Sequence, residues 1–205
     1  MKIKLSDAGK RFSREWIFRH ADLEFLPNRA YAITGANGSG KSTFLQTIAS
    51  LLQPSEGSIS YWHNNQPVGA ENAYQYVSFC APYLELVEEM MLTEFLYFHS
   101  RFKPFIAGFD PSTIAAAIGL PNTGSKQIRD FSSGMKQRVK LAQAIFSNTP
   151  VILLDEPCTN LDAAGIELYK SLIEQYAKGR LVIVSSNDFV EYAFCQEVIN
   201  ISQFK

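Results

Sequence analysis

The stretch Gly35-Ala36-Asn37-Gly38-Ser39-Gly40-Lys41-Ser42 decides the fold of this chain. It follows the apolar run 30–34 and precedes a helical pattern over residues 42–52. Glycines in this pattern let consecutive backbone N–H groups curl around phosphate oxygens. A buried strand, a glycine-rich turn and a helix, in that order, form the context that such a phosphate-binding loop, or P-loop, requires. The sequence therefore predicts that this loop binds the phosphates of a nucleotide.

Different residues of the loop are predicted to bind the phosphates of ATP and the Mg²⁺ ion. Lys41 places a positive charge at the β- and γ-phosphates and so assists catalysis, while the hydroxyl of Ser42 is a ligand for Mg²⁺. The helix that follows directs its positive N-terminal end at the phosphates. The predicted nucleotide contacts of this segment are Gly35, Ala36, Asn37, Gly38, Ser39, Gly40, Lys41, Ser42 and Thr43.

Two acids follow a second apolar run. The run 151–154 ends in Asp155-Glu156-Pro157, so both carboxylates are expected at the carboxyl end of a buried parallel strand. Ligand sites of open α/β sheets lie at that edge. Asp155 is therefore the second predicted Mg²⁺ ligand, and Glu156 is the predicted catalytic base for the water that attacks the γ-phosphate.

Strand-like and helical segments alternate along the chain, which predicts an α/β fold of the P-loop NTPase type with a mostly parallel sheet and an antiparallel β edge. A single domain is expected, in which residues 1–81 and 150–205 form the core and about 82–149 form a helical insertion. Strands are predicted at 2–5, 17–25, 29–34, 57–62, 73–79, 151–155, 180–185 and 196–202. Further helices are predicted at 93–102, 111–118, 133–147 and 162–176.

Composition excludes several classes of protein. The 205 residues contain 19 basic and 20 acidic side chains, so the basic excess of a nucleic-acid-binding protein is missing and no nucleic-acid partner is expected. Three cysteines without a CxxC pair argue against a disulfide framework. No run approaches the ~18 apolar residues of a membrane-spanning helix, and the N-terminus does not resemble a signal peptide. If the protein works at a membrane, another polypeptide is expected to span it.

The segment Phe131-Ser132-Ser133-Gly134-Met135-Lys136-Gln137-Arg138 resembles the signature motif of ATP-binding cassette (ABC) proteins. Ser132 and Gly134 match the usual pattern, whereas Ser133 and Met135 depart from it. A serine hydroxyl and backbone N–H groups at a helix N-terminus offer an anion site. The resemblance implies that Ser132, Ser133 and Gly134 contact the γ-phosphate of an ATP held by an opposite subunit.

Further matches to this family occur in the expected order along nearly the whole chain, among them the segments 52–57 and 160–162. Phe12 stands where the family places an aromatic side chain that stacks on adenine, and Trp16 is the alternative. The resemblance implies an ATPase subunit that powers transport through a separate membrane-spanning subunit. It further implies a second cassette, identical or different, and a peripheral position on the cytoplasmic face of the membrane.

One group of apolar residues leaves two interpretations open. They are core residues, or they line the groove that in this family receives a short helix of the membrane subunit. The group comprises Tyr83, Leu84, Leu86, Val87, Met90 and Met91.

Two positions depart from the family in ways that bear on catalysis. Cys80 stands where a glutamine is usual, and a thiol is a poor ligand for Mg²⁺. Gln75 could correspond to this glutamine only if the stretch were aligned with the family pattern in another register. Asn187 stands where a histidine usually contacts the γ-phosphate, and its amide can donate a hydrogen bond but cannot take up a proton. Asn187 is kept as a candidate catalytic residue. The alternative function is an ATP-gated dimerising regulatory module with little hydrolysis.

Overall fold

The computed structural model describes residues 1–123 and 126–205. Its centre is a parallel sheet of five strands, in which apolar and β-branched residues predominate because layers of structure cover both faces. All five residues of β7 and all five of β8 are buried. In spatial order the strands are β6 (Val77–Cys80), β7 (Val151–Asp155), β8 (Leu181–Ser185), β3 (Ala30–Thr34) and β9 (Glu197–Asn200).

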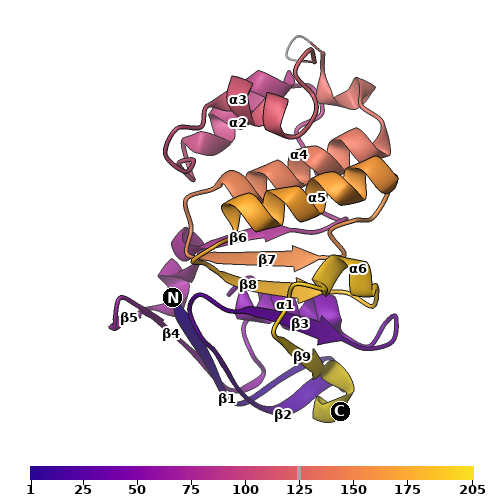
Figure 1. Ribbon diagram of the computed structural model, residues 1–205. Helices are drawn as coiled ribbons and strands as arrows, with labels where there is room; N and C mark the ends of the chain where they lie inside the picture. The colour runs from indigo at the N-terminus through magenta and orange to yellow at the C-terminus, as the bar shows by residue number, and fades with distance from the viewer. Residues whose placement is uncertain (124–125) are drawn as a thin grey trace.

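Helices cover the two faces of this sheet (Figure 1). Helix α1 (Lys41–Ile48) lies on one face, and α4 (Ser133–Phe146) and α5 (Ala163–Tyr176) lie side by side on the other. The buried residues accordingly form two apolar clusters, one on each side of the sheet. This arrangement brings the start of α1 and the ends of β7 and β8 to the same edge, as the order of the parallel strands predicts.

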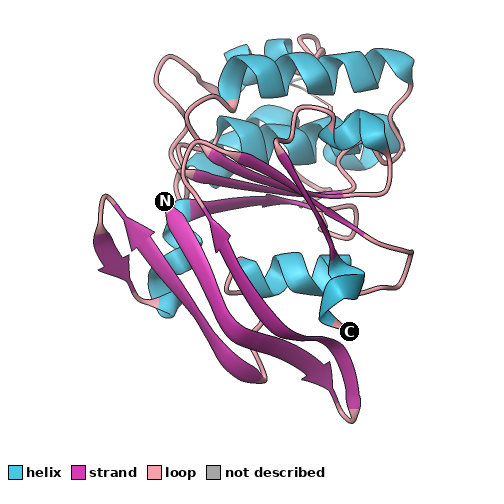
Figure 2. Ribbon diagram, turned by 60° about the horizontal axis from the view of Figure 1, so that its bottom comes forward, coloured by secondary structure: helices cyan, strands magenta, loops and turns pink. Residues whose placement is uncertain are grey.

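A second, antiparallel sheet packs beyond α1 (Figure 2) and forms the predicted antiparallel part of the fold. The first two strands join in a hairpin that runs much further than predicted, since the first strand continues to Phe12, where it pairs with Glu15. The short strand at Gln66–Val68, the last of this sheet along the chain, was not predicted. In spatial order the strands are β2 (Glu15–Phe25), β1 (Lys2–Phe12), β4 (Glu56–His63) and β5 (Gln66–Val68).

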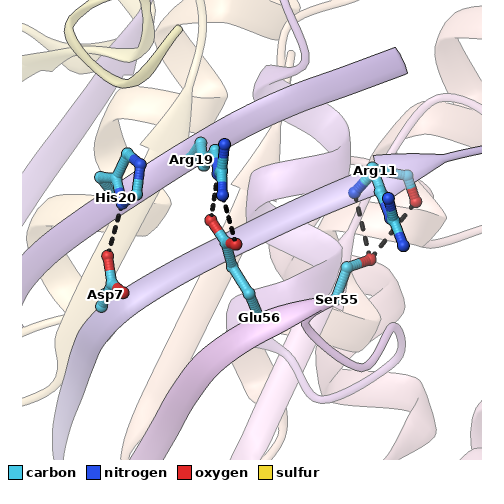
Figure 3. Close-up of polar contacts among 6 residues, drawn as sticks. All are labelled: Asp7, Arg11, Arg19, His20, Ser55 and Glu56. Atoms are coloured by element: carbon cyan, nitrogen blue, oxygen red, sulfur yellow. Dashed lines mark hydrogen bonds and ion pairs between the residues drawn. The ribbon is translucent and has the colours of Figure 1, made fainter. Parts of the chain in front are cut away.

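Polar contacts join three strands of this sheet on its exposed side (Figure 3). The guanidinium of Arg19 donates two hydrogen bonds to the Glu56 carboxylate, with Nε···Oε1 2.5 Å and Nη2···Oε2 3.0 Å. This pairing lowers the pKa of Glu56. His20 contacts Asp7 at 2.7 Å. The Arg19–Glu56 pair therefore ties the hairpin to β4, whereas the His20–Asp7 contact joins the two strands of the hairpin.

The helical part of the chain stands away from the two sheets (Figure 1). It contains α2 (Leu92–Ser100) and α3 (Pro111–Ala117), followed by a 3₁₀ turn at Ile128–Asp130 that leads into α4. Asp110 caps α3, because its carboxylate accepts a hydrogen bond from the Thr113 N–H. The helices predicted in this region therefore form within two residues of the expected positions.

Two predicted strands are partly wrong. Residues 73–79 do not form one strand, because Ala70–Tyr76 is a 3₁₀ helix and only the following four residues join the sheet as β6. The last predicted strand ends at Asn200, after which Ile201–Phe204 forms a 3₁₀ turn. In both places a residue of the turn, Ala73 or Ile201, is fully buried, so tertiary packing overrides the extended preference of the aromatic and β-branched residues nearby.

The short helix α6 (Phe189–Tyr192) was not predicted. Within the described ranges, none of the helices is both long enough and apolar enough to cross a bilayer.

Candidate functional site

The P-loop connects β3 to α1 in the conformation that its glycines permit. Gly40 has φ of 99°, and a Cβ atom there would lie 2.2 Å from Cγ2 of Ile17. Only glycine fits at this position without displacing β2. The Lys41 side chain folds back over the loop, and its ammonium donates to the carbonyl oxygens of Gly35 at 2.7 Å and Ala36 at 3.3 Å. The lysine is thus held at the loop although its side chain is almost fully buried.

The N-terminus of α1 is available to an anion. Among the residues that the structure describes, none caps it with a side chain, and its first turn contains no acidic residue. The first N–H groups of a helix have no acceptor within the helix, and the helix dipole adds partial positive charge there. Together with the ammonium of Lys41, this end of α1 attracts phosphate groups.

A cavity of about 250 Å³ opens at this point, and it joins the two motifs that the sequence singled out. Glu156 reaches it from the loop after β7. Because the P-loop and this acid border the same space, a phosphate held by the loop would lie within reach of the carboxylate. The lining residues are Ile17, Asn37, Gly38, Gly40, Lys41, Ser42, Thr43 and Glu156.

Asp155 ends β7 and is 1% exposed. In the part of the chain that the structure describes, its Oδ1 atom has no hydrogen-bond partner. A buried carboxylate oxygen without a partner is costly, and oxygen is the ligand type that Mg²⁺ prefers. Asp155 and the Ser42 hydroxyl therefore fit a magnesium site between β7 and α1.

Glu156 occupies a strained backbone position. Its φ is 42°, a left-handed conformation that costs a non-glycine residue about 1–3 kcal/mol. The conformation is maintained because the Glu156 N–H donates to the Ser185 carbonyl at 2.8 Å. The backbone turns at this point, so the side chain of Asp155 stays buried while that of Glu156 is exposed at the cavity.

The loop after Glu156 is tied to α4 by Gln137. This side chain is 2% exposed, and its Nε2 donates to the buried Pro157 carbonyl at 2.7 Å. Sequence reasoning missed Gln137, because a glutamine one turn into an amphipathic helix gives no signal of burial.

Replacing Gln137 by leucine is expected to lower the free energy of unfolding by about 1–3 kcal/mol, since the Pro157 carbonyl would lose its donor while staying buried. Urea unfolding of the variant measures this loss. The matched control is Gln175→Leu on the exposed face of α5, which should stay within about 0.5 kcal/mol of the wild type. Equal stability of the two variants would contradict the assigned role of Gln137.

Asn187 contacts the P-loop directly. Its Oδ1 accepts from the Gly35 N–H at 3.1 Å, and its Nδ2 donates to Oδ1 of Asn37 at 3.2 Å. The loop after β8 thereby braces the start of the P-loop. A contact of Asn187 with the γ-phosphate stays a prediction.

The predicted adenine platform lies outside the cavity lining. Phe12 is at the tip of the β1–β2 hairpin, 48% exposed, with the Lys10 ammonium 5.3 Å from its ring centre. The guanidinium groups of Arg11 and Arg19 lie 5.4 Å and 4.5 Å from the centre of the Trp16 ring. From this hairpin the residue that borders the cavity is Ile17, which sequence reasoning missed. Stacking of Phe12 on adenine stays a prediction.

The signature segment starts α4. Ser132 is its N-cap, and the Ser132 hydroxyl accepts from the Met135 N–H at 3.2 Å. A Cβ atom on Gly134 would lie 3.0 Å from the Asn160 carbonyl oxygen, so this segment packs against the loop between β7 and α5. Neither these two residues nor Ser133 is among those that line the P-loop cavity. Within one chain, the two motifs form separate surfaces.

Cys80 is fully buried at the end of β6, where burial raises the pKa of its thiol to about 12. It is therefore a neutral core residue, as the sequence interpretation favoured. A groove of about 670 Å³ lies beside it. The apolar segment that follows divides between core and surface, and a partner helix in the groove stays a prediction. Leu86 is buried in the core and Met90 packs against it, whereas Tyr83, Val87 and Met91 are exposed. The groove is lined by Pro82, Tyr83, Leu84, Glu85, Leu86, Glu88, Glu89, Lys136 and Lys140.

Comparison with known proteins places this site in a family. The family model described as ABC transporter matches residues 18–159. The ABC transporter ATP-binding protein NatA of Bacillus subtilis is 30% identical, over 97% of this chain and 85% of its own length. The cytochrome c biogenesis ATP-binding export protein CcmA of Rhizobium etli is 29% identical, over 97% of this chain and 94% of its own.

The fold agrees with that of solved cassettes. A dimeric, post-hydrolysis structure of the ATP-binding cassette MJ0796 bound to ADP and Pi superposes with a TM-score of 0.78 at 22% identity, covering 97% of this chain and 93% of that one. The range that the family model matches includes the P-loop, the acids at the end of β7 and the segment that caps α4. The chain therefore belongs to the ABC transporter family and is an ATP-binding subunit of it.

Proposed function

We propose that this chain binds ATP with Mg²⁺ in the cavity between the P-loop and Glu156 and hydrolyses it to power transport. The single observation that carries the proposal is that the P-loop, Lys41 and Glu156 border one cavity. A phosphate group and an attacking water can be held together there, and phosphoryl transfer depends mainly on such positioning and on charge.

Each residue has a defined part in the reaction. The backbone N–H groups of the P-loop and the ammonium of Lys41 hold the β- and γ-phosphates, for which Lys41 exchanges its bonds to the loop carbonyls. Asp155 and Ser42 hold Mg²⁺, which neutralises charge that develops on the phosphates. Glu156 orients the attacking water and accepts its proton. Asn187 keeps the start of the P-loop in place, and its amide is a further donor toward the γ-phosphate.

A second cassette completes the site in this proposal. In one chain the signature segment is not part of the cavity lining, although a helix N-terminus with a serine cap is an anion site. We infer that Ser132, Ser133 and Gly134 of one cassette close on the ATP of another. The MJ0796 cassette, whose structure is described as dimeric, supports this inference by its shared fold.

In this proposal, a separate membrane-spanning subunit uses the energy of ATP hydrolysis for transport. The groove beside β6 supports this part of the proposal, because its lining combines the exposed ring of Tyr83 and the half-buried Pro82 and Leu84 with three acidic and two basic side chains. A helix of a partner that carries both apolar and charged residues would fit it. The protein would then act on the side of the membrane where ATP is present.

One experiment tests the whole proposal. The tagged chain is purified from its native membranes, the co-purifying polypeptides are identified by mass spectrometry, and phosphate release from ATP is measured with Mg²⁺ and with EDTA. We expect a membrane-spanning polypeptide in fixed ratio and hydrolysis that requires Mg²⁺. A complex that assembles with ATP but releases no phosphate would contradict the proposal and favour the regulatory module.

A further inference from the structure

Glu191 is a buried carboxylate that has no part in the reaction described above. It lies on α6, which follows β8 at the carboxyl edge of the parallel sheet (Figure 1), and it is 5% exposed. Among the residues that the structure describes, no cation pairs with it. Burial raises the pKa of Glu191, and the negative charges of Asp188 and Glu156 add to the rise. An acid buried near other acids lowers stability unless hydrogen bonds compensate.

The carboxylate of Glu191 holds the loop that follows the predicted catalytic base. Its Oε1 accepts from the Cys158 N–H at 2.7 Å. The Pro157 carbonyl belongs to the same peptide group and accepts from Nε2 of the buried Gln137, also at 2.7 Å. One peptide group is therefore held at both of its polar atoms, by α4 through Gln137 and by α6 through Glu191. We call this arrangement the peptide clamp.

The clamped peptide is the middle of a turn that begins at Glu156. The Thr159 N–H donates to the Glu156 carbonyl at 3.1 Å and closes the turn around this peptide. Glu156 has φ of 42°, and such a conformation persists only where the surroundings fix it. The Glu156 N–H bond to the Ser185 carbonyl holds the start of the turn, and the peptide clamp holds its middle. The direction of the Glu156 side chain therefore depends on Gln137 and Glu191.

Glu191 is itself fixed by its neighbours. Its carbonyl accepts from the hydroxyl of Tyr169 at 2.7 Å, and Tyr169 is fully buried on α5. The same short segment begins with Asn187, whose amide contacts Gly35 at the start of the P-loop. The segment 187–191 thus contacts both parts of the chain that border the predicted ATP site, the P-loop and the turn after β7.

We propose that Glu191 is a positioning residue for hydrolysis, whose carboxylate holds the turn after β7 so that Glu156 faces the attacking water. This inference rests on the proposed hydrolysis of ATP. A general base has to lie within hydrogen-bond reach of the proton that it accepts, and a misplacement of about 1 Å can lower the rate about 100-fold. Glu191 is not among the residues that line the cavity, so its loss should lower kcat and leave the binding of ATP unchanged.

The test compares three substitutions of Glu191 in the complex purified from its native membranes, by phosphate release over a range of ATP concentrations. Glu191→Met keeps much of the volume but removes the acceptor, so kcat should fall about 10–100-fold while KM stays within about threefold. Glu191→Gln keeps an oxygen that can accept from the Cys158 N–H, and its kcat should stay within about threefold of the wild-type value. Glu191→Asp keeps the charge but is too short to reach, so it should also be slow, and it serves if the Met variant does not fold.

Thr149→Val is the matched control for a loss of stability alone. Thr149 is 5% exposed and precedes β7, at the edge of the sheet opposite to the predicted ATP site. Its hydroxyl donates to Oγ of Ser78 at 2.9 Å and to the Val151 carbonyl at 3.1 Å. The variant should unfold at lower urea than the wild type and keep the wild-type kcat. If Glu191 only stabilised the fold, variants at the two positions with equal losses of stability would lose kcat equally.

A second comparison asks whether Glu191 acts through Glu156. In a Glu156→Gln background the base is already lost, so adding Glu191→Met should lower the residual single-turnover rate by less than about twofold. Two independent losses that multiply would contradict the proposed role.

The possible outcomes separate this inference from the proposed function. A wild-type complex that releases no phosphate contradicts the proposed function, and with it this inference. A wild type that hydrolyses ATP, beside a folded Glu191→Met or Glu191→Asp variant with the same kcat, contradicts the role of Glu191 alone. A Glu191→Gln variant as slow as Glu191→Met also contradicts it, because the charge and not the hydrogen bond would then matter. An equal loss of ATP affinity would contradict it as well, since Glu191 would then shape the nucleotide site in general.

Discussion

Glu156→Gln is expected to lower the rate of ATP hydrolysis at least about 100-fold while ATP still binds, because an amide cannot accept the proton of the attacking water. The substitution preserves the size of the side chain, so the strained turn at this residue and the Glu156 N–H bond to the Ser185 carbonyl remain. The cavity of the variant should therefore keep its shape but lack the catalytic base. Steady-state phosphate release measures the change.

The same variant reports on the pairing of cassettes. If hydrolysis separates two cassettes that ATP holds together, Glu156→Gln should accumulate as an ATP-dependent dimer, visible as a doubled mass in light scattering. The matched control is Glu174→Gln, an exposed acid of α5, which should hydrolyse ATP at the wild-type rate and stay monomeric after turnover. Unchanged hydrolysis in Glu156→Gln would show that the base is another residue, and equally slow wild-type turnover would favour the regulatory module.

Lys41→Ala is expected to weaken ATP binding about 100-fold, which corresponds to roughly 2.8 kcal/mol at about 1.4 kcal/mol for each factor of ten. The ammonium is the buried positive charge at the P-loop, and hydrogen bonds from a charged donor to phosphate are among the stronger contacts of a binding site. Isothermal titration calorimetry with ATP and Mg²⁺ measures the affinity.

The control for this variant must separate the loss of a positive charge at the phosphates from a change in the conformation of the P-loop. Lys41 also donates to the Gly35 and Ala36 carbonyls, so its removal affects the loop itself. Lys178→Ala, an exposed lysine after α5, removes the same charge away from the cavity and should bind ATP normally. Unfolding of Lys41→Ala by urea should remain cooperative. Wild-type affinity in Lys41→Ala would contradict the assignment of residues 35–42 as the phosphate site.

Several features of the fold could be predicted because they depend on residues close together in the chain. An apolar run, a glycine-rich turn and a helical pattern predicted β3, the P-loop and α1. A fully apolar run before two acids predicted β7 and the position of Asp155 at its end. The predicted starts of α3, α4 and α5 lie within one residue of the observed ones, at which Asp110, Ser132 and Asp162 cap the three helices.

Other features could not be predicted, because pairing between distant segments decides them. The β1–β2 hairpin extends to Phe12 although residues 11–15 at its tip are exposed, and its register shifts three times between Leu5 and Arg11. A strand was predicted over residues 73–79, but Ala70–Tyr76 form a 3₁₀ helix in which Ala73 is buried. The alternation of apolar and polar residues does not predict such segments, because backbone pairing and tertiary contacts, and not an apolar face, stabilise them.

By itself the sequence determined the phosphate loop, the two acids and the cap of α4, because the chemistry of each is contained in a few adjacent residues. The tertiary structure alone decided which of these surfaces meet. It brought Glu156 and the P-loop to one cavity, and it placed the amide of Asn187 against Gly35 and Asn37 at the start of the P-loop. Such contacts depend on how strands and helices pack across the sheet, and that packing is a property of the whole chain.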